Sequence, residues 1–174
     1  MIGRERVIQG GAFALKAARD RSLLDDPRIA LFPTAITDRY RSEADDLRSR
    51  PDDMTRVDAA LKAYKTTIAA IVTSGGRITA GSDAPLVPYG LGLHTELEYL
   101  VEAGLTPYQA LQTATVNAAE ALGVGDEIGT IEPGKLADLV FVGGDPTRDI
   151  KNARDVRAVM RGGRYYDVPT LLRR

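Results

Sequence analysis

Apolar residues recur along the chain with two different periodicities, which predict helices in most of the chain and short strands near its end. From Thr55 to Ser74 they recur at steps of three and four residues, as on one face of a helix. This stripe consists of Val57, Leu61, Tyr64, Ile68, Ile71 and Val72. We expect Thr55 and Asp58 to form a capping box at the start of this helix, and Gly75 or Gly76 to end it in a left-handed conformation.

The stretch from Arg77 to Asp83 follows that helix and has the pattern of a short buried strand. Ile78 and Ala80 fall on one side of it and their polar or small neighbours on the other, as a period of two requires. Pro85 cannot continue a β ladder, so the strand should end near Asp83. A helix, a two-glycine loop and a buried strand together predict one αβ unit of a parallel sheet.

Two further helices are expected after a loop that contains Pro85 and extends to Leu93. One begins near His94 and runs to about Ala103, with its glutamates facing outward: Glu96, Glu98 and Glu102. The next begins with Thr106 as N-cap, Pro107 in the first helical position and Gln109 completing a capping box, and it continues to Leu122.

The first fifty residues predict mainly polar helices. We expect a short helix around Phe13–Arg19, because Gly10 and Gly11 interrupt the pattern before it. Residues 29–33 form an apolar run that Pro33 stops. Residues 37–48 predict a helix with few apolar anchors beyond Tyr40 and Leu47, whose alternating charges indicate a solvated surface more than a binding face.

The last fifty residues change to a strand pattern. Residues 139–142 and 156–160 predict two strands, and Gly162-Gly163 predicts a tight turn into a third at residues 164–166. Such an antiparallel unit is too small to be stable alone. We therefore expect it to pack on the preceding helices or on strands that lie outside this sequence.

The composition excludes several classes of function but does not indicate a particular one. The 174 residues are 44% hydrophobic and 27% charged, with a net charge of −1, as in an ordinary soluble domain. Nothing favours nucleic acid or an anionic membrane as a partner, and no apolar run is long enough to span a bilayer. The absence of cysteine excludes disulfides, thiolate catalysis and cysteine-ligated zinc. The charged N-terminus lacks the apolar core of a signal peptide, so we expect a cytoplasmic location if Met1 is the natural start.

Asp83 is the first candidate for a catalytic or metal-binding residue. Parallel α/β folds carry their chemistry at the C-terminal ends of strands, where Asp83 is predicted to lie. The structural alternative is an Asx-turn, in which Asp83 caps its own backbone before Pro85.

A series of short motifs resembles the C-terminal third of the metal-dependent amidohydrolase superfamily, in particular its imidazolonepropionase-like and prolidase-type members. The resemblance covers roughly residues 70–166. Its motifs are Ile78-Thr79-Ala80-Gly81-Ser82-Asp83-Ala84-Pro85, Gly92-Leu93-His94-x-Glu96-Leu97, Ala103-Gly104-Leu105-Thr106-Pro107, Ala114-Thr115-x-Asn117-Ala118-Ala119 and Gly129-x-Ile131-x-Pro133-Gly134-Lys135-x-Ala137-Asp138-Leu139-Val140.

The resemblance implies a fold and a mechanism. The fold class would be α/β: part of a (β/α)₈ barrel at residues 1–125, and at residues 126–174 a small antiparallel β segment of a composite sandwich domain. Asp83 would be a metal ligand and the general base in hydrolysis of amide or cyclic-amide C–N bonds, with a divalent metal, usually zinc, as cofactor. His94 would lie on the same rim as a candidate substrate-binding residue, its alternatives being a helix cap or packing. We expect Lys135, Asp138 and Asn117 to be structural.

The departures from the family pattern predict an incomplete site. The family's other metal ligands include a His-x-His pair, whereas this sequence has one histidine. Asp83 and His94 cannot supply the three protein ligands of a catalytic zinc, and a (β/α)₈ barrel needs about 250 residues. We therefore expect a fragment of a longer hydrolase that is inactive and binds no zinc tightly when isolated, and whose partner is the missing N-terminal part of the barrel. Two alternatives remain: a non-catalytic remnant or split-barrel subunit that needs a partner chain, and an unrelated small α/β binding module.

Overall fold

The computed structural model describes residues 9–85 and 87–173. The chain divides into two compact units: Met1–Thr67 with Ser82–Glu96, and Ile68–Gly81 with Leu97–Arg174. None of the helices in the described ranges is both long and apolar enough for a membrane crossing.

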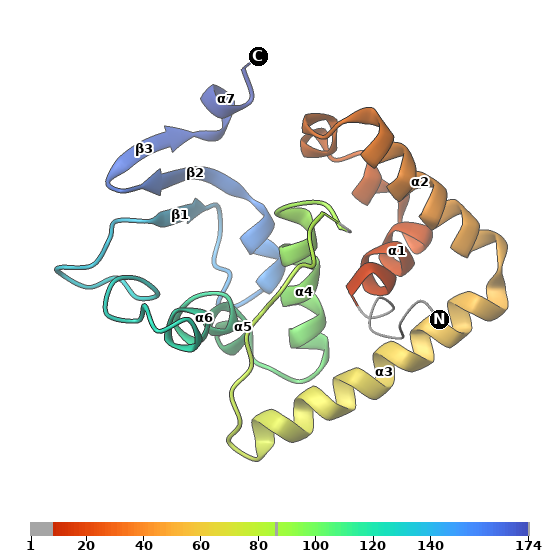
Figure 1. The fold of residues 1–174 in the computed structure, drawn as a ribbon, viewed down its shortest axis with the longest axis horizontal. Helices are drawn as coiled ribbons and strands as arrows, with labels where there is room; N and C mark the ends of the chain where they lie inside the picture. The colour runs from red at the N-terminus through yellow and green to blue at the C-terminus, as the bar shows by residue number, and fades with distance from the viewer. Residues whose placement is uncertain (1–8, 86, 174) are drawn as a thin grey trace. The chain divides into compact units, whose positions relative to one another are not determined.

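The first unit is built from helices α1 (Gln9–Arg19) and α2 (Thr34–Ser49), which pack on each other and are joined by the 3₁₀ turns η2 (Arg21–Leu24) and η3 (Pro27–Leu31) (Figure 1). Its core includes an apolar cluster of Phe13, Ala17, Leu24, Ile29, Tyr40, Ala44, Val87 and Leu91. The helix predicted around Phe13–Arg19 is confirmed. The expected interruption by Gly10 and Gly11 is wrong, because α1 begins at Gln9.

Helix α2 is more than a solvated surface, which corrects the prediction for residues 37–48. It buries one face, formed by Thr37, Tyr40, Ala44 and Leu47. Small residues and a tyrosine make up most of this face, so its apolar character is weak in the sequence. The spacing of three and four residues nevertheless places all of them on one side of the helix.

The long helix predicted after residue 55 is α3 (Pro51–Thr73), which begins one turn earlier than expected. The proposed capping box is wrong, because the Thr55 hydroxyl donates a hydrogen bond of 2.9 Å to the Pro51 carbonyl inside the helix. Gly75 has φ +81°, which confirms the left-handed end. Leu61 is the buried residue of the helix, whereas Tyr64 and Ile71 are each 38% exposed.

The segment from Gly76 to Asp83 is not a strand, which corrects the central structural prediction. Its residues lie in no β ladder of the described chain. The Ala80 amide donates to the Thr113 carbonyl at 3.0 Å, and the Asn117 side-chain amide donates to the Ile78 carbonyl at 3.1 Å. A parallel strand requires a neighbouring strand for its remaining backbone groups, and the described chain supplies helices there instead.

Three helices follow this segment: α4 (Leu91–Glu102), α5 (Pro107–Thr113) and α6 (Val116–Ala121). The capping box of Thr106 and Gln109, with Pro107 in the first turn, is confirmed. The single helix predicted to reach Leu122 is wrong: it breaks at Thr115, and Leu122 is 76% exposed.

The C-terminal residues form the predicted antiparallel sheet. Strands β1 (Leu139–Val142), β2 (Val156–Arg161) and β3 (Arg164–Asp167) pair in the order β1-β2-β3, with η4 (Ile150–Arg154) before β2 and α7 (Val168–Leu171) after β3 (Figure 1). The second unit has its own apolar cluster, centred on Leu97, Leu100, Leu105, Ala110, Ile150 and Ala153. The protein is therefore a helix-rich α/β chain with a small antiparallel sheet.

Candidate active site

Asp83 has a backbone conformation that is uncommon for its residue type. Its φ is +48°, and its side chain is exposed to solvent. Left-handed geometry is disfavoured for residues with a Cβ atom, although aspartate tolerates it better than most. Such outliers persist only where the surrounding structure holds them, and they are frequent at functional sites. The conformation directs the chain sharply from the extended segment into the turn at Ala84 and Pro85.

The N-terminal turn of α4 packs directly against this region. An added Cβ on Gly92 would lie 2.5 Å from Val87 Cγ2 and 3.4 Å from Ser82 Cβ. Glycine is therefore the residue that lets the helix approach the side chains of Val87 and Ser82 so closely. The motif that contains Gly92 and His94 thus has a local steric reason for its glycine.

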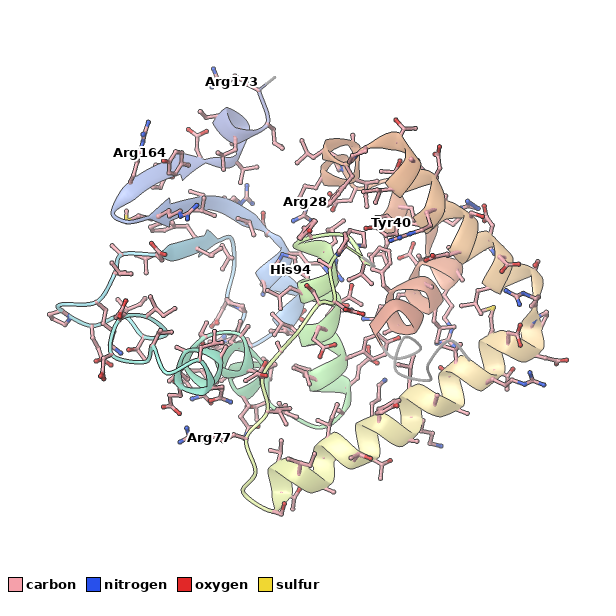
Figure 2. All side chains as sticks on the ribbon, viewed as in Figure 1. Arg28, Tyr40, Arg77, His94, Arg164 and Arg173 are labelled. Atoms are coloured by element: carbon pink, nitrogen blue, oxygen red, sulfur yellow. The ribbon has the colours of Figure 1, made fainter. Side chains whose placement is uncertain are left out.

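His94 is the fourth residue of α4, which begins at Leu91 and therefore three residues earlier than predicted (Figure 2). Its side chain is half-buried, and its Nδ1 atom is shielded from solvent. Throughout residues 9–85 and 87–173, no group of three histidine, aspartate or glutamate side chains is placed to hold a metal ion. The described residues therefore do not fit a complete zinc site, and Asp83 could contribute one oxygen ligand to it.

Glu96 is a titratable residue whose burial the sequence pattern did not predict. It was expected to face outward on its helix, but it is half-buried, and burial raises the pKa of its carboxyl from the ordinary 4.5 to about 7. Glu96 follows Gly92 by one helical turn, so both lie on the same face of α4. The sequence carries no signal for this burial, because the close contact of Gly92 with Ser82 arises only in the folded chain.

The residues expected to be structural do make structural contacts. Lys135 Nζ donates to the Gly125 carbonyl at 2.7 Å and to the Thr130 hydroxyl at 2.5 Å. Asp138 accepts a hydrogen bond of 2.6 Å from the Gly162 amide, which ties β1 to the β2–β3 turn. Asn117 donates to the Ile78 carbonyl. These three predictions are confirmed.

The second unit contains a cavity of about 290 Å³ between α5, α6 and the segment that begins at Gly76. Its polar lining includes the side chains of Gln109, Gln112 and Asn117. Arg77, which Figure 2 labels, forms an ion pair with Glu120 there, so the two charges neutralise each other. Neither Asp83 nor His94 lines this cavity.

Comparison with known proteins places these features in a family. The sequence model of the Amidohydrolase family matches residues 33–165. An ochratoxinase of Aspergillus niger is 36% identical over 118 residues, which are 64% of this chain and 23% of that protein. An imidazolonepropionase of Thermoplasma volcanium is 31% identical over 91 residues, which are 52% of this chain and 22% of that protein.

A solved structure is also similar. The crystal structure of a Xaa-Pro dipeptidase with bound methionine in its active site matches with a TM-score of 0.59 and 27% identity, covering 92% of this chain and 33% of that one. The chain thus spans less than a quarter of the length of these two curated relatives and a third of this solved structure. The resemblance found in the sequence is confirmed, and because the family match covers most of its residues, the chain belongs to the amidohydrolase family.

Proposed function

We propose that this chain is the C-terminal portion of an amidohydrolase that hydrolyses amide or cyclic-amide C–N bonds in small molecules, with Asp83 as metal ligand and general base. One observation carries the proposal: within the segment that matches the family, Asp83 has an exposed carboxylate on a left-handed backbone. Left-handed turn positions favour glycine, asparagine and aspartate, and the family match is what links this particular carboxylate to chemistry.

The role of Asp83 follows from the chemistry of its carboxylate. An ionised carboxylate offers oxygen atoms that can coordinate a cation and accept a proton. A divalent metal, zinc in the usual case, would supply Lewis acidity and lower the pKa of water to about 7. Asp83 would take the proton that the attacking water loses and would hold it for the departing amine. His94 is proposed to contact the substrate from the start of α4.

The remaining ligands must come from outside the described residues, since these contain no three-residue metal cluster. The proposed partner of this chain is therefore the rest of an amidohydrolase barrel, continuous with it or separate. In this proposal the 174 residues alone neither bind zinc tightly nor hydrolyse amides. Stoichiometric tight zinc in the purified chain would contradict that.

A chimera tests the proposal directly. Residues 33–165 would replace the matching segment of the Xaa-Pro dipeptidase, and zinc content and hydrolysis of a panel of N-acyl amino acids, dipeptides and cyclic amides would be measured. Asp83→Asn should lower kcat at least about 100-fold, as loss of a general base does. The control is Asp126→Asn, which changes an exposed aspartate in a loop and should leave kcat unaltered. Equal activity of the two variants would exclude Asp83 as the base.

A split-barrel subunit is the second candidate function. The observation in its favour is the extended segment Gly76–Asp83, which belongs to no β ladder in the described chain. Such a segment can join a sheet that another chain supplies. Native mass spectrometry of this chain, mixed with a dipeptidase that lacks its matching third, would detect a one-to-one complex if this candidate is correct.

A further inference from the structure

Two hydrogen bonds from helix α2 to one carbonyl oxygen hold the turn that follows Asp83. Arg39 Nη2 donates to the Pro85 carbonyl oxygen at 2.8 Å, and the Tyr40 hydroxyl donates to the same oxygen at 2.7 Å. A carbonyl oxygen has two lone pairs and can accept both. Consecutive residues of one helix thus hold a backbone atom two residues beyond Asp83, across 46 and 45 positions of sequence.

Tyr40 also connects this carbonyl to an aromatic cluster in the same unit. Its side chain is 2% exposed, and its ring meets those of Phe13 and Phe32 edge-on, at centroid distances of 6.0 Å and 6.5 Å. Phe32 in turn stacks on Tyr89 at 5.9 Å, with only 3° between the ring planes. Tyr40 therefore supports the chain at Pro85 through its hydroxyl and, by way of Phe32, at Tyr89.

These hydrogen bonds matter because the backbone of Asp83 has a disfavoured left-handed conformation, which persists only where neighbouring residues hold it. On one side, Gly92 brings α4 against Ser82. On the other, α2 holds Pro85. Burial raises the pKa of the Tyr40 phenol above its ordinary value of 10.0. A phenol is protonated at neutral pH even without this shift, so the hydroxyl can donate.

Resting on the proposed role of Asp83, we propose that Tyr40 and Arg39 are positioning residues that fix the Pro85 carbonyl and thereby the direction of the Asp83 carboxylate. Neither would touch the substrate. The sequence pattern had indicated a surface without binding function for this helix, and only the bonds to Pro85 reveal the connection. The competing explanation is that Tyr40 merely fills the core.

Tyr40→Phe separates the two explanations, because it removes the hydroxyl and keeps the ring. Hydrogen exchange of the 174-residue chain would be measured for Tyr40→Phe and Arg39→Gln, with Tyr64→Phe and Arg41→Gln as matched controls on exposed positions. Loss of one net hydrogen bond should make the turn open more often, and should speed exchange of the Leu91 and Gly92 amides, which donate to the Tyr89 and Pro88 carbonyls at 2.8 Å, about threefold to tenfold. The amides of α1 and α3 should exchange as before.

Exchange within twofold of the unchanged chain in both variants would overturn the proposal. If Tyr40→Phe speeds exchange everywhere, it has destabilised the whole unit, and Arg39→Gln then decides, because its side chain is only half-buried. Arg39→Lys retains a donor and should restore most of the slow exchange. If exchange in Arg39→Lys is as fast as in Arg39→Gln, hydrogen-bond donation by Arg39 does not hold the turn, and this part of the proposal is wrong.

The chimera then separates this proposal from the proposed function. Tyr40→Phe and Arg39→Gln should each lower kcat about threefold to tenfold with little change in KM, because a misdirected base affects the chemical step and not binding. If Asp83→Asn abolishes hydrolysis while both positioning variants keep full kcat, the positioning proposal is wrong and the function stands. If Asp83→Asn has no effect, the proposed function is wrong and the exchange data alone decide whether α2 holds the turn.

Discussion

The Arg154 guanidinium on η4 pairs with the Glu98 carboxylate on α4 at 2.5 Å, across 56 positions of sequence. The two side chains are only 21% and 11% exposed. Both residues lie in the family-matched region and in the second unit, where the pair joins η4 to α4. It is one of the few ion pairs of the described chain that water reaches poorly, whereas most others lie on the surface.

Arg154→Gln should therefore destabilise the protein strongly. Removing the cationic partner of a largely buried carboxylate costs more than the pair itself contributes, and we expect a loss of about 2–3 kcal/mol in the free energy of unfolding. Urea denaturation measures it. Arg148→Gln is the control, because Arg148 and its partner Asp145 are 88% and 52% exposed, and it should change stability by less than about 0.5 kcal/mol. Equal effects of the two variants would contradict the expectation.

Gly92→Ala should destabilise, although alanine is the better helix former. Within a helix the exchange normally gains about 1 kcal/mol. Here the new methyl group would lie 2.5 Å from Val87 Cγ2, and relief of such overpacking costs about 1–3 kcal/mol. The thermal midpoint should fall. Gly125→Ala, whose nearest contact would be an ordinary 3.4 Å to Glu120, should leave it nearly unchanged.

Glu96 should make stability depend on pH between about 4.5 and 7. Burial raises the pKa of its carboxyl to about 7 in the folded chain, while the unfolded chain keeps the ordinary 4.5. In that window the folded state binds more protons than the unfolded state, so stability is greatest at the acidic end and falls as pH rises. The total change is on the order of 2–3 kcal/mol.

Urea midpoints at a series of pH values measure this dependence, and Glu96→Gln should flatten it. Glu102→Gln, at an exposed glutamate of the same helix, should retain it. A slope that persists in Glu96→Gln would show that another group is responsible.

The left-handed backbone at Asp83 should make glycine a more stable replacement than alanine. At φ +48° glycine carries no Cβ penalty, whereas alanine carries about 1–2 kcal/mol. We expect Asp83→Gly to be more stable than Asp83→Ala by about 1 kcal/mol in denaturant unfolding. If both variants are equally stable, the left-handed backbone is not retained in solution.

Local patterns in the sequence were sufficient for the elements that rely on nearby residues. The Thr106–Gln109 capping box, the left-handed Gly75 and the hairpin at Gly162-Gly163 all arise from contacts a few residues apart. The motifs from Ile78 to Val140 likewise indicated the family, which the family match confirms. These features depend on hydrogen bonds and backbone preferences that a short stretch carries with it.

Other features required the tertiary structure. A buried strand was predicted at residues 77–83 because the pattern of side chains reports burial but not the presence of a neighbouring strand. For the same reason, Glu96 was predicted to face solvent, since the close approach at Gly92 has no sequence signature. Helix α2 was predicted to be a solvated surface, since the bonds from Arg39 and Tyr40 to Pro85 have none either. The sequence alone determined the family, the local caps and turns and the candidate carboxylate, because short-range forces encode them. Only the folded chain decided which side chains surround that carboxylate and hold its backbone, because long-range packing brings them together.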